Sequence, residues 1–178
     1  MVYKLKATIP ISKVFMREYE VYPEMNLFSF NRFILNDLSF GLDQMVIFRA
    51  FDANGKMTSQ YGMFDLGSGT IDNVTFADLI EKGEIHIEYC YDFRNNRIIY
   101  IDFEGEDEVN RKLSYPCVVA EKGHNPGQFS DKYEDYMYLN THTVPSASVE
   151  ADDDLDDDED EDDMDKPEEI YDENESVE

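Results

Sequence analysis

A cysteine and a histidine, two residue types that can do chemistry together, lie near each other in a stretch rich in glycine and proline. Cys117 and His124 could supply a thiolate and a base for covalent catalysis, or two ligands for a metal ion. Two ligands do not close a zinc site, and Pro116 beside the cysteine is typical of a turn. His86, the other candidate base, falls on the polar side of a strand pattern. We therefore expect no catalytic residue and no metal ligand.

Two glycine-containing acidic loops raise the question of bound ions or cofactors. Residues 52–56 read Asp-Ala-Asn-Gly-Lys, which lacks the third oxygen ligand and the distal glutamate of a calcium loop. The Asn-Gly pair instead predicts a hairpin turn. Residues 65–70 contain two glycines but do not open a helix, as a phosphate-binding loop does. With so many acids in the chain, a chance pair of carboxylates does not indicate acid–base catalysis. No cofactor is expected.

Aromatic residues recur between residues 89 and 103. They could form a platform for stacking nucleic-acid bases, but core packing on one face of a sheet is the favoured interpretation. If the folded body binds a partner, we expect that surface to involve Tyr91, Arg94, Arg97, Tyr100, Tyr115 and His124.

The character of the chain changes near residue 149. Residues 150–178 contain 19 acids and one base, Lys166, so they hold −18 of the formal charge of −26. Such a segment has too few apolar side chains to offset the entropy lost on ordering. We predict a single domain over residues 1–140, a linker over 141–149 and a disordered acidic tail over 150–178. The tail is expected to solubilise the chain or to engage a basic protein partner.

Composition limits the size of the folded domain and the cellular compartment in which we expect the protein. Residues 1–140 are the usual size of one domain. Two cysteines do not make a disulfide framework, and Cys90 in a strand pattern indicates a small buried side chain. No signal peptide and no membrane span is visible, so a cytoplasmic location is expected. The net negative charge disfavours direct binding to nucleic acid.

Hydrophobic periodicity predicts the elements that position these residues. Alternation over residues 2–10 places Tyr3, Leu5, Ala7 and Ile9 on one strand face, and residues 14–22 answer it as a hairpin. Further strands are expected over 45–51, 57–64, 84–93 and 98–103. A helical stripe of Leu27, Phe30, Ile34 and Leu38 predicts a helix over 27–39, capped by Asn26 and ended by Gly41. Thr75 and Asp78 form a capping-box pattern for a short helix that stops at Gly83.

The turn between residues 93 and 98 decides which side chains face each other. A two-residue turn at Asn95 and Asn96 would place Asp102 opposite Tyr89, on the apolar face. A three-residue loop ending at Arg97 pairs Phe103 with Tyr89 and Ile101 with Tyr91. Because a slip of one residue inverts every side chain, the hydrophobic pattern favours the three-residue loop.

The element order predicts an α+β fold. The sequence reads β-β-α-β-β-α-β-β, which indicates a largely antiparallel sheet built from hairpins, with the helices packed on one face. Residues 105–127 are expected to be turns and loops, and residues 131–139 a short aromatic helix.

Residues 75–128 carry motifs that resemble a known family. The run TFADLIEKG precedes a strand ending Tyr91-Asp92-Phe93 and a return strand IIYIDFEG. With Tyr115-Pro116, Gly123-His124-Asn125-Pro126-Gly127 and Tyr133-Glu134-Asp135-Tyr136, it resembles the plasmid pRiA4b ORF-3-like family over about residues 2–139. That family usually continues Tyr-Asp-Phe with Gly-Asp and then Trp and His, whereas this chain has Arg-Asn-Asn-Arg. Its Gly-Pro segment also lacks the family's second proline and the acids that follow.

The resemblance implies a fold and no biochemical activity. We therefore expect a non-catalytic protein-interaction or accessory domain. Two alternatives stay open at this point. One is a nucleic-acid accessory factor of a mobile element, which clustered Lys and Arg on one face would favour. The other is an enzyme, which would show a deep pocket with convergent polar groups.

Overall fold

The computed structural model describes residues 1–9 and 14–129. These ranges contain seven strands and two helices, in the order β1 (Val2–Thr8), β2 (Met16–Val21), α1 (Leu27–Asp37), β3 (Ile47–Phe51), β4 (Met57–Gly62), α2 (Phe76–Glu81), β5 (His86–Asp92), β6 (Arg97–Asp107) and β7 (Cys117–Lys122). The helix expected at 131–139, the linker at 141–149 and the acidic tail at 150–178 lie outside the described residues.

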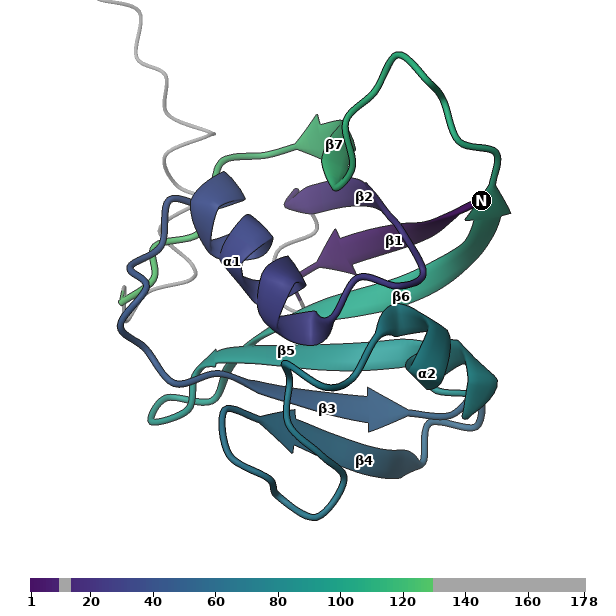
Figure 1. Ribbon diagram of the computed structural model, residues 1–178. Coiled ribbons are helices and arrows are strands. Elements are labelled where there is room, and N and C mark those ends of the chain that lie inside the picture. Colours follow the sequence, from purple (N-terminus) through teal and green to yellow (C-terminus); the bar gives the residue numbers. More distant parts are fainter. Residues whose placement is uncertain (10–13, 130–178) are drawn as a thin grey trace, which may run out of the picture. The chain divides into compact units, whose positions relative to one another are not determined.

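All seven strands of the described part form one antiparallel sheet with the order β4-β3-β5-β6-β1-β2-β7 (Figure 1). Consecutive strands pair in three hairpins, β1–β2, β3–β4 and β5–β6. The pairing of β3 with β5 and of β6 with β1 joins the hairpins. Strands β4 and β7 therefore lie at opposite edges of the sheet.

The predicted α+β class, with helices packed on one face, is wrong, because the sheet dominates the structure. The two described helices contribute only 11 and 6 residues. The predicted element order also lacked β7, which pairs with β2 along the sheet edge. The β2–β7 pairing shifts register between Glu18 and Tyr19 and leaves Val119 without an opposite residue. This bulge interrupts the two-residue alternation that identifies a strand.

The apolar face predicted for the first strand lies in the core. Tyr3, Leu5, Ala7 and Ile9 are all buried. The same face continues across the sheet through Tyr19, Phe48, Tyr89 and Ile101, which are also buried. We call the opposite side of the strands the open face. Its side chains are mostly half-buried, and it carries the polar residues that the alternation predicted.

Helix α1 contacts the core face through its predicted stripe. Leu27, Phe30, Ile34 and Leu38 are buried, and the ring of Phe30 meets Tyr19 of β2 edge-on at 5.8 Å. Asn26 caps the helix by accepting a hydrogen bond from the Ser29 amide. The helix ends earlier than predicted, because Ser39 rather than Gly41 takes the positive φ, 59°.

Helix α2 begins at the predicted capping box. The Thr75 hydroxyl accepts from the Asp78 amide at 3.2 Å, and the Asp78 carboxylate accepts from the Thr75 amide at 2.8 Å. Gly83 follows the helix with a φ of +76°. The ring of Phe76 meets Phe30 of α1 at 4.9 Å, so the two helices pack on each other. Neither helix of the described ranges is long and apolar enough to cross a membrane.

The predicted register of β5 and β6 is wrong. Tyr89 lies opposite Ile99 instead of Phe103, and Ile87 lies opposite Ile101. The turn spans residues 93–96, and a register shift between Cys90 and Asp92 absorbs one further residue at Tyr91. The choice of apolar face survives this shift, because the pairing moved by an even number of residues and side chains repeat every two.

Candidate functional site

The six residues predicted as an interaction surface do not form one surface. Tyr91 is fully buried on the core face, where its ring contacts Phe40 at 4.9 Å. Tyr100 lies on the open face with 36% of its surface exposed. Since the two rings lie on opposite sides of the sheet, no partner can contact both. Arg94 and His124 are exposed, in the β5–β6 turn and in the segment after β7.

The remaining two residues of that set have structural roles. Arg97 is buried, donates from Nη1 to the Gln128 carbonyl at 2.8 Å and lies 3.5 Å from the Asp92 carboxylate. It thereby fixes the chain after β7 to the start of β6. Tyr115 packs its ring against Tyr22 at 5.1 Å, and its hydroxyl accepts from the Asn110 amide.

The open face of β5 and β6 carries the closest approach to a catalytic arrangement. His86 Nδ1 lies 2.6 Å from Asp102 Oδ1, and both side chains are nearly half exposed. They line a hollow of about 390 Å³ together with Thr8, Phe51, Gly55, Ile87, Glu88 and Tyr100. An aspartate can orient a histidine as a general base. Within residues 1–9 and 14–129, however, the described hydrogen bonds include none between His86 and the hydroxyls of Thr8 or Tyr100, the two hydroxyl residues that line this hollow. His86 keeps the surface position predicted for it.

The two cysteines are in environments that suppress thiolate chemistry. Both thiols are free. Burial raises the pKa of the Cys90 thiol, and burial together with the Glu20 carboxylate raises the pKa of Cys117. Within residues 1–9 and 14–129, no group of three His, Cys, Asp or Glu side chains is placed to hold a metal ion. A raised thiol pKa makes Cys117 a poorer nucleophile at neutral pH.

The two glycine-containing acidic loops use their amides internally. The Asp65 carboxylate accepts from the Gly67 amide at 2.7 Å and from the Gly69 amide at 2.9 Å, which lowers the pKa of Asp65. In the same way Asp52 accepts from the amides of Asn54 and Lys56, and its pKa is lowered. Amides that are already paired with a carboxylate do not cradle a phosphate. Both loops are turns held by their own aspartates.

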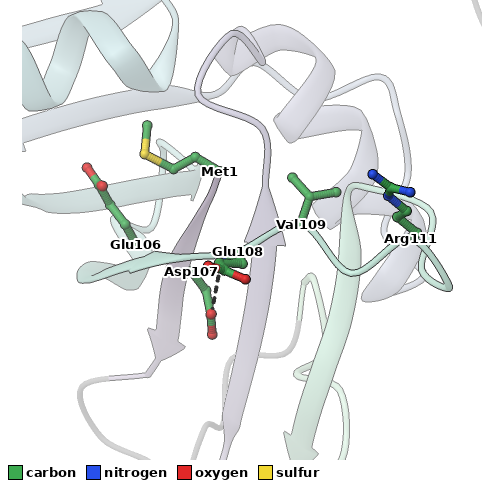
Figure 2. A pocket seen from close by; sticks show the side chains of 6 residues that line it. All are labelled: Met1, Glu106, Asp107, Glu108, Val109 and Arg111. Carbon is green, nitrogen blue, oxygen red and sulfur yellow. Dashed lines mark hydrogen bonds between the residues drawn. The ribbon is translucent and has the colours of Figure 1, made fainter.

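An open hollow lies where β6 passes the N-terminus of β1 (Figure 2). Its volume is about 630 Å³, and its lining comprises Met1, Glu106, Asp107, Glu108, Val109 and Arg111. Asp107 accepts from the Glu108 amide at 2.8 Å and lies 3.7 Å from Lys4 Nζ. Three neighbouring carboxylates on an open surface form a solvated acidic patch, so we assign no site here.

An apolar groove is the most distinctive surface of the described chain. It encloses about 230 Å³ and is lined, apart from backbone, by apolar side chains: Met45, Val46, Ile47, Gly62, Met63, Phe64, Leu66 and Phe93. Phe64 is 73% exposed and Phe93 is 58% exposed, and Met45, Met63 and Leu66 are exposed as well. Single exposed apolar side chains are common on protein surfaces, but a contiguous group of large ones often marks a binding site.

Sheet topology builds this groove. Strand β3 is antiparallel to both β4 and β5, so the start of β3 lies beside the ends of its two neighbours. The groove residues come from these three places: residues 45–47, residues 62–66 and Phe93 in the β5–β6 turn. The sequence pattern predicts that each segment lies at one end of an apolar strand. The three segments meet because β3 pairs with β5, and the pattern did not predict that pairing. An available signal was that Phe64 and Phe93 both continue a strand's apolar run into a turn.

Comparisons with known proteins define the fold class. No family model matches the chain, so the resemblance to the plasmid pRiA4b ORF-3-like family stays a prediction. No curated protein matches it either. The structure is similar to the crystal structure of MM3350, a protein of unknown function from Methanosarcina mazei Go1, with a TM-score of 0.67 and 19% sequence identity. The match covers 79% of this chain and 82% of that one. At this identity the likeness establishes a shared sheet-dominated fold and nothing of the activity.

Proposed function

We propose that this chain is a non-catalytic protein-interaction module and that the apolar groove between β3, β4 and β5 is its binding surface. The exposed groove is the single observation that supports the proposal most. Burying such side chains against a partner removes apolar surface from water, which stabilises most protein complexes. Aromatic and methionine side chains are enriched at the centres of interfaces, and the groove contains both.

Charge supports a basic partner for this groove. The first 149 residues carry 22 acids and 14 bases, and residues 150–178 add a further −18. Asp65 lies between the lining residues Phe64 and Leu66 in the sequence, and Asp43 lies two residues before Met45, so each of these two groove segments has a carboxylate beside it in the chain. We infer a partner segment that places an apolar side chain in the groove and basic residues beside it. The acidic residues 150–178 would increase its association rate by electrostatic steering.

The charge distribution gives less support to a nucleic-acid accessory factor. That alternative requires unpaired Lys and Arg clustered on one face. On the open face, however, Lys4, Lys6 and Arg49 each lie within 4 Å of a carboxylate, those of Asp107, Glu104 and Glu88.

We propose a cytoplasmic location for the protein, which the two free cysteines favour.

A paired-variant capture experiment tests the proposal. The full chain is immobilised, and proteins retained from an extract of cells that express it are quantified by mass spectrometry. The double variant Phe64→Ser, Phe93→Ser should bind its specific partner roughly thirtyfold more weakly or worse, because truncating a central apolar anchor costs about 2 kcal/mol or more. A direct titration with the identified partner should show the same loss.

Two exposed apolar residues outside the groove provide the matched control. Leu42 and Phe129 are 67% and 60% exposed and do not line the groove. The double variant Leu42→Ser, Phe129→Ser should therefore bind like the wild type. Equal loss in both variants, or no loss in either, would contradict the groove as the binding surface.

A further inference from the structure

A second surface with its own chemistry lies at the opposite edge of the sheet from β4. Strand β7 is the last strand on that side, and its only described partner is β2. No backbone hydrogen bond of the described chain reaches residues 117–122 from outside the sheet. An edge strand of six residues therefore presents amide and carbonyl groups that a further strand can pair with.

The side chains of β7 offer little of the protection that sheet edges usually have. Natural proteins block exposed edges with charged side chains, prolines inside the strand, bulges or a covering helix, and of these β7 has the bulge at Val119. The first four residues of β7 are Cys-Val-Val-Ala, without a charge, and Val119 is exposed. The charged residues come only at the end of the strand, at Glu121 and Lys122. The first part of this edge is accessible to an added strand.

The neighbouring strand determines which charge an added strand should carry. On the open face, the small side chains of Cys117 and Ala120 lie opposite Glu20 and Glu18 of β2. Strands lie about 4.8 Å apart, so a strand added beyond β7 would be roughly 10 Å from β2. A long lysine or arginine side chain on that strand can pass over the small residues of β7 and meet these carboxylates.

Both glutamates of β2 lack a partner cation in the described chain. The adjacent lysines of β1 lie opposite them in register, yet Lys6 pairs with Glu104 of β6 and Lys4 with Asp107. Within residues 1–9 and 14–129 no ion pair is made by Glu18 or Glu20. The Glu20 carboxylate does interact with the Tyr115 hydroxyl. Neither carboxylate is neutralised by a cation of the described chain, so both can attract one that arrives over β7.

We propose that the outer edge of β7 binds an extended segment of a basic protein, which adds to the sheet as an eighth strand. Main-chain hydrogen bonds to β7 hold the segment, and lysine or arginine at alternate positions selects it through Glu18 and Glu20. A second copy of this chain is a poor occupant, because its charge of −26 repels an identical molecule. The inference shares with the proposed function only the premise that the partner is a protein. The site itself is separate, because β7 lies at the edge of the sheet opposite the apolar groove.

Amide hydrogen exchange on the full chain tests this inference with a synthetic probe. The probe is a short peptide with lysine at alternate positions and valine or threonine between them. Its binding should slow exchange at alternate amides of residues 117–122 at least tenfold, and leave the groove segments unchanged. The double variant Glu18→Gln, Glu20→Gln should weaken binding about three- to tenfold, as expected for two exposed ion pairs. Glu81→Gln, an exposed charge on α2, should have no effect.

Two control peptides separate strand addition from simple charge attraction. A peptide with glutamate in place of lysine should not bind. The lysine peptide with N-methylated backbone amides keeps its charge but cannot pair along the edge, so it should not protect β7. The inference is overturned if the N-methylated peptide binds equally well, or if no β7 amide gains protection. Strong protection of every β7 amide in the free protein would also overturn it, because a segment of the chain or a second copy would then occupy the edge.

Discussion

Arg17 and Glu84 show that this protein uses buried charge for architecture. Arg17 is 3% exposed and donates from Nη1 to the carbonyls of Met16 and Lys122, and from Nη2 to Asn125 Oδ1. The segment after β7, whose histidine suggested metal or covalent chemistry, is thereby fastened to β2. Alternation with Tyr19 and Val21 places Arg17 on the core face, but it does not predict the carbonyls of the β7 segment that accept its hydrogen bonds.

Glu84 should be essential for the stability of the β4 edge. Its carboxylate is buried and accepts hydrogen bonds from the hydroxyls of Thr58, Ser59 and Tyr61. Replacing Glu84 by Ala leaves these hydroxyls without their acceptor. We expect the free energy of unfolding in urea to fall by about 1–3 kcal/mol. Glu81→Ala on the surface of α2 should change it by less than about 0.5 kcal/mol, and equal effects of the two variants would contradict a structural role for Glu84.

Phe30 and Phe64 should differ sharply in their effect on stability. Phe30 is fully buried between β2 and α2, whereas Phe64 lines the apolar groove and is exposed. Phe30→Ala removes buried surface and leaves a cavity, so unfolding should become easier by ~3–5 kcal/mol. Phe64→Ala should stay within about 0.5 kcal/mol of the wild type. Urea unfolding followed by tyrosine fluorescence measures both, and a wild-type midpoint for Phe30→Ala would show that α1 does not support the core.

At the scale of elements, the sequence predicted correctly those features that depend on residues within a single strand or helix. The alternation at Tyr3, Leu5 and Ala7, the stripe of α1 and the capping box of α2 each depend on residues within one element. The predicted register of β5 and β6 was wrong because the alternation of apolar residues does not show how many residues form the turn or that Tyr91 is bulged. Strand β7 was missed for a different reason, since its bulge at Val119 interrupts the two-residue period.

The capping box predicts a defined pH dependence for α2. Hydrogen bonds from Thr75 lower the pKa of Asp78 in the folded chain below its ordinary value of 3.8. A depressed carboxyl pKa adds stability above the unfolded pKa, and that stability is lost as the pH falls through the folded pKa. Asp78→Asn should therefore lower Tm at pH 7, and the difference from the wild type should shrink below about pH 4.

Thermal melts of the two chains between pH 7 and pH 2 measure this difference. Thr75→Ala removes the other half of the capping box and should show a similar loss at neutral pH. A difference between Asp78→Asn and the wild type that stays constant down to pH 2 would show that the carboxylate charge does not stabilise the cap.

At the scale of the whole molecule, the candidate surfaces follow from strand order. The apolar groove needs β3 beside β5, and the free edge needs β7 outside β2. Neither neighbour relation is encoded by a short-range pattern, because each joins segments that are distant in the sequence. The separation of Tyr91 and Tyr100 has a local origin instead, because the alternation that buries Tyr91 with Tyr89 and Ile99 on the core face places Tyr100 on the open face.

The distribution of charge gives the last prediction, which concerns residues 150–178. Their removal takes away −18 and leaves about −8 on the remaining chain. Like charges destabilise a compact state through mutual repulsion, and salt screens that repulsion over about 8–10 Å at physiological strength. A chain that ends at Ser148 should therefore melt at the wild-type temperature or slightly higher at low salt, and at the same temperature in 0.5 M salt. A full-length control with Asn and Gln in place of the acids of 150–178 should match the shortened chain, because charge rather than chain length sets the difference. A clear fall in Tm for the shortened chain alone would show that these residues contribute packing to the folded body.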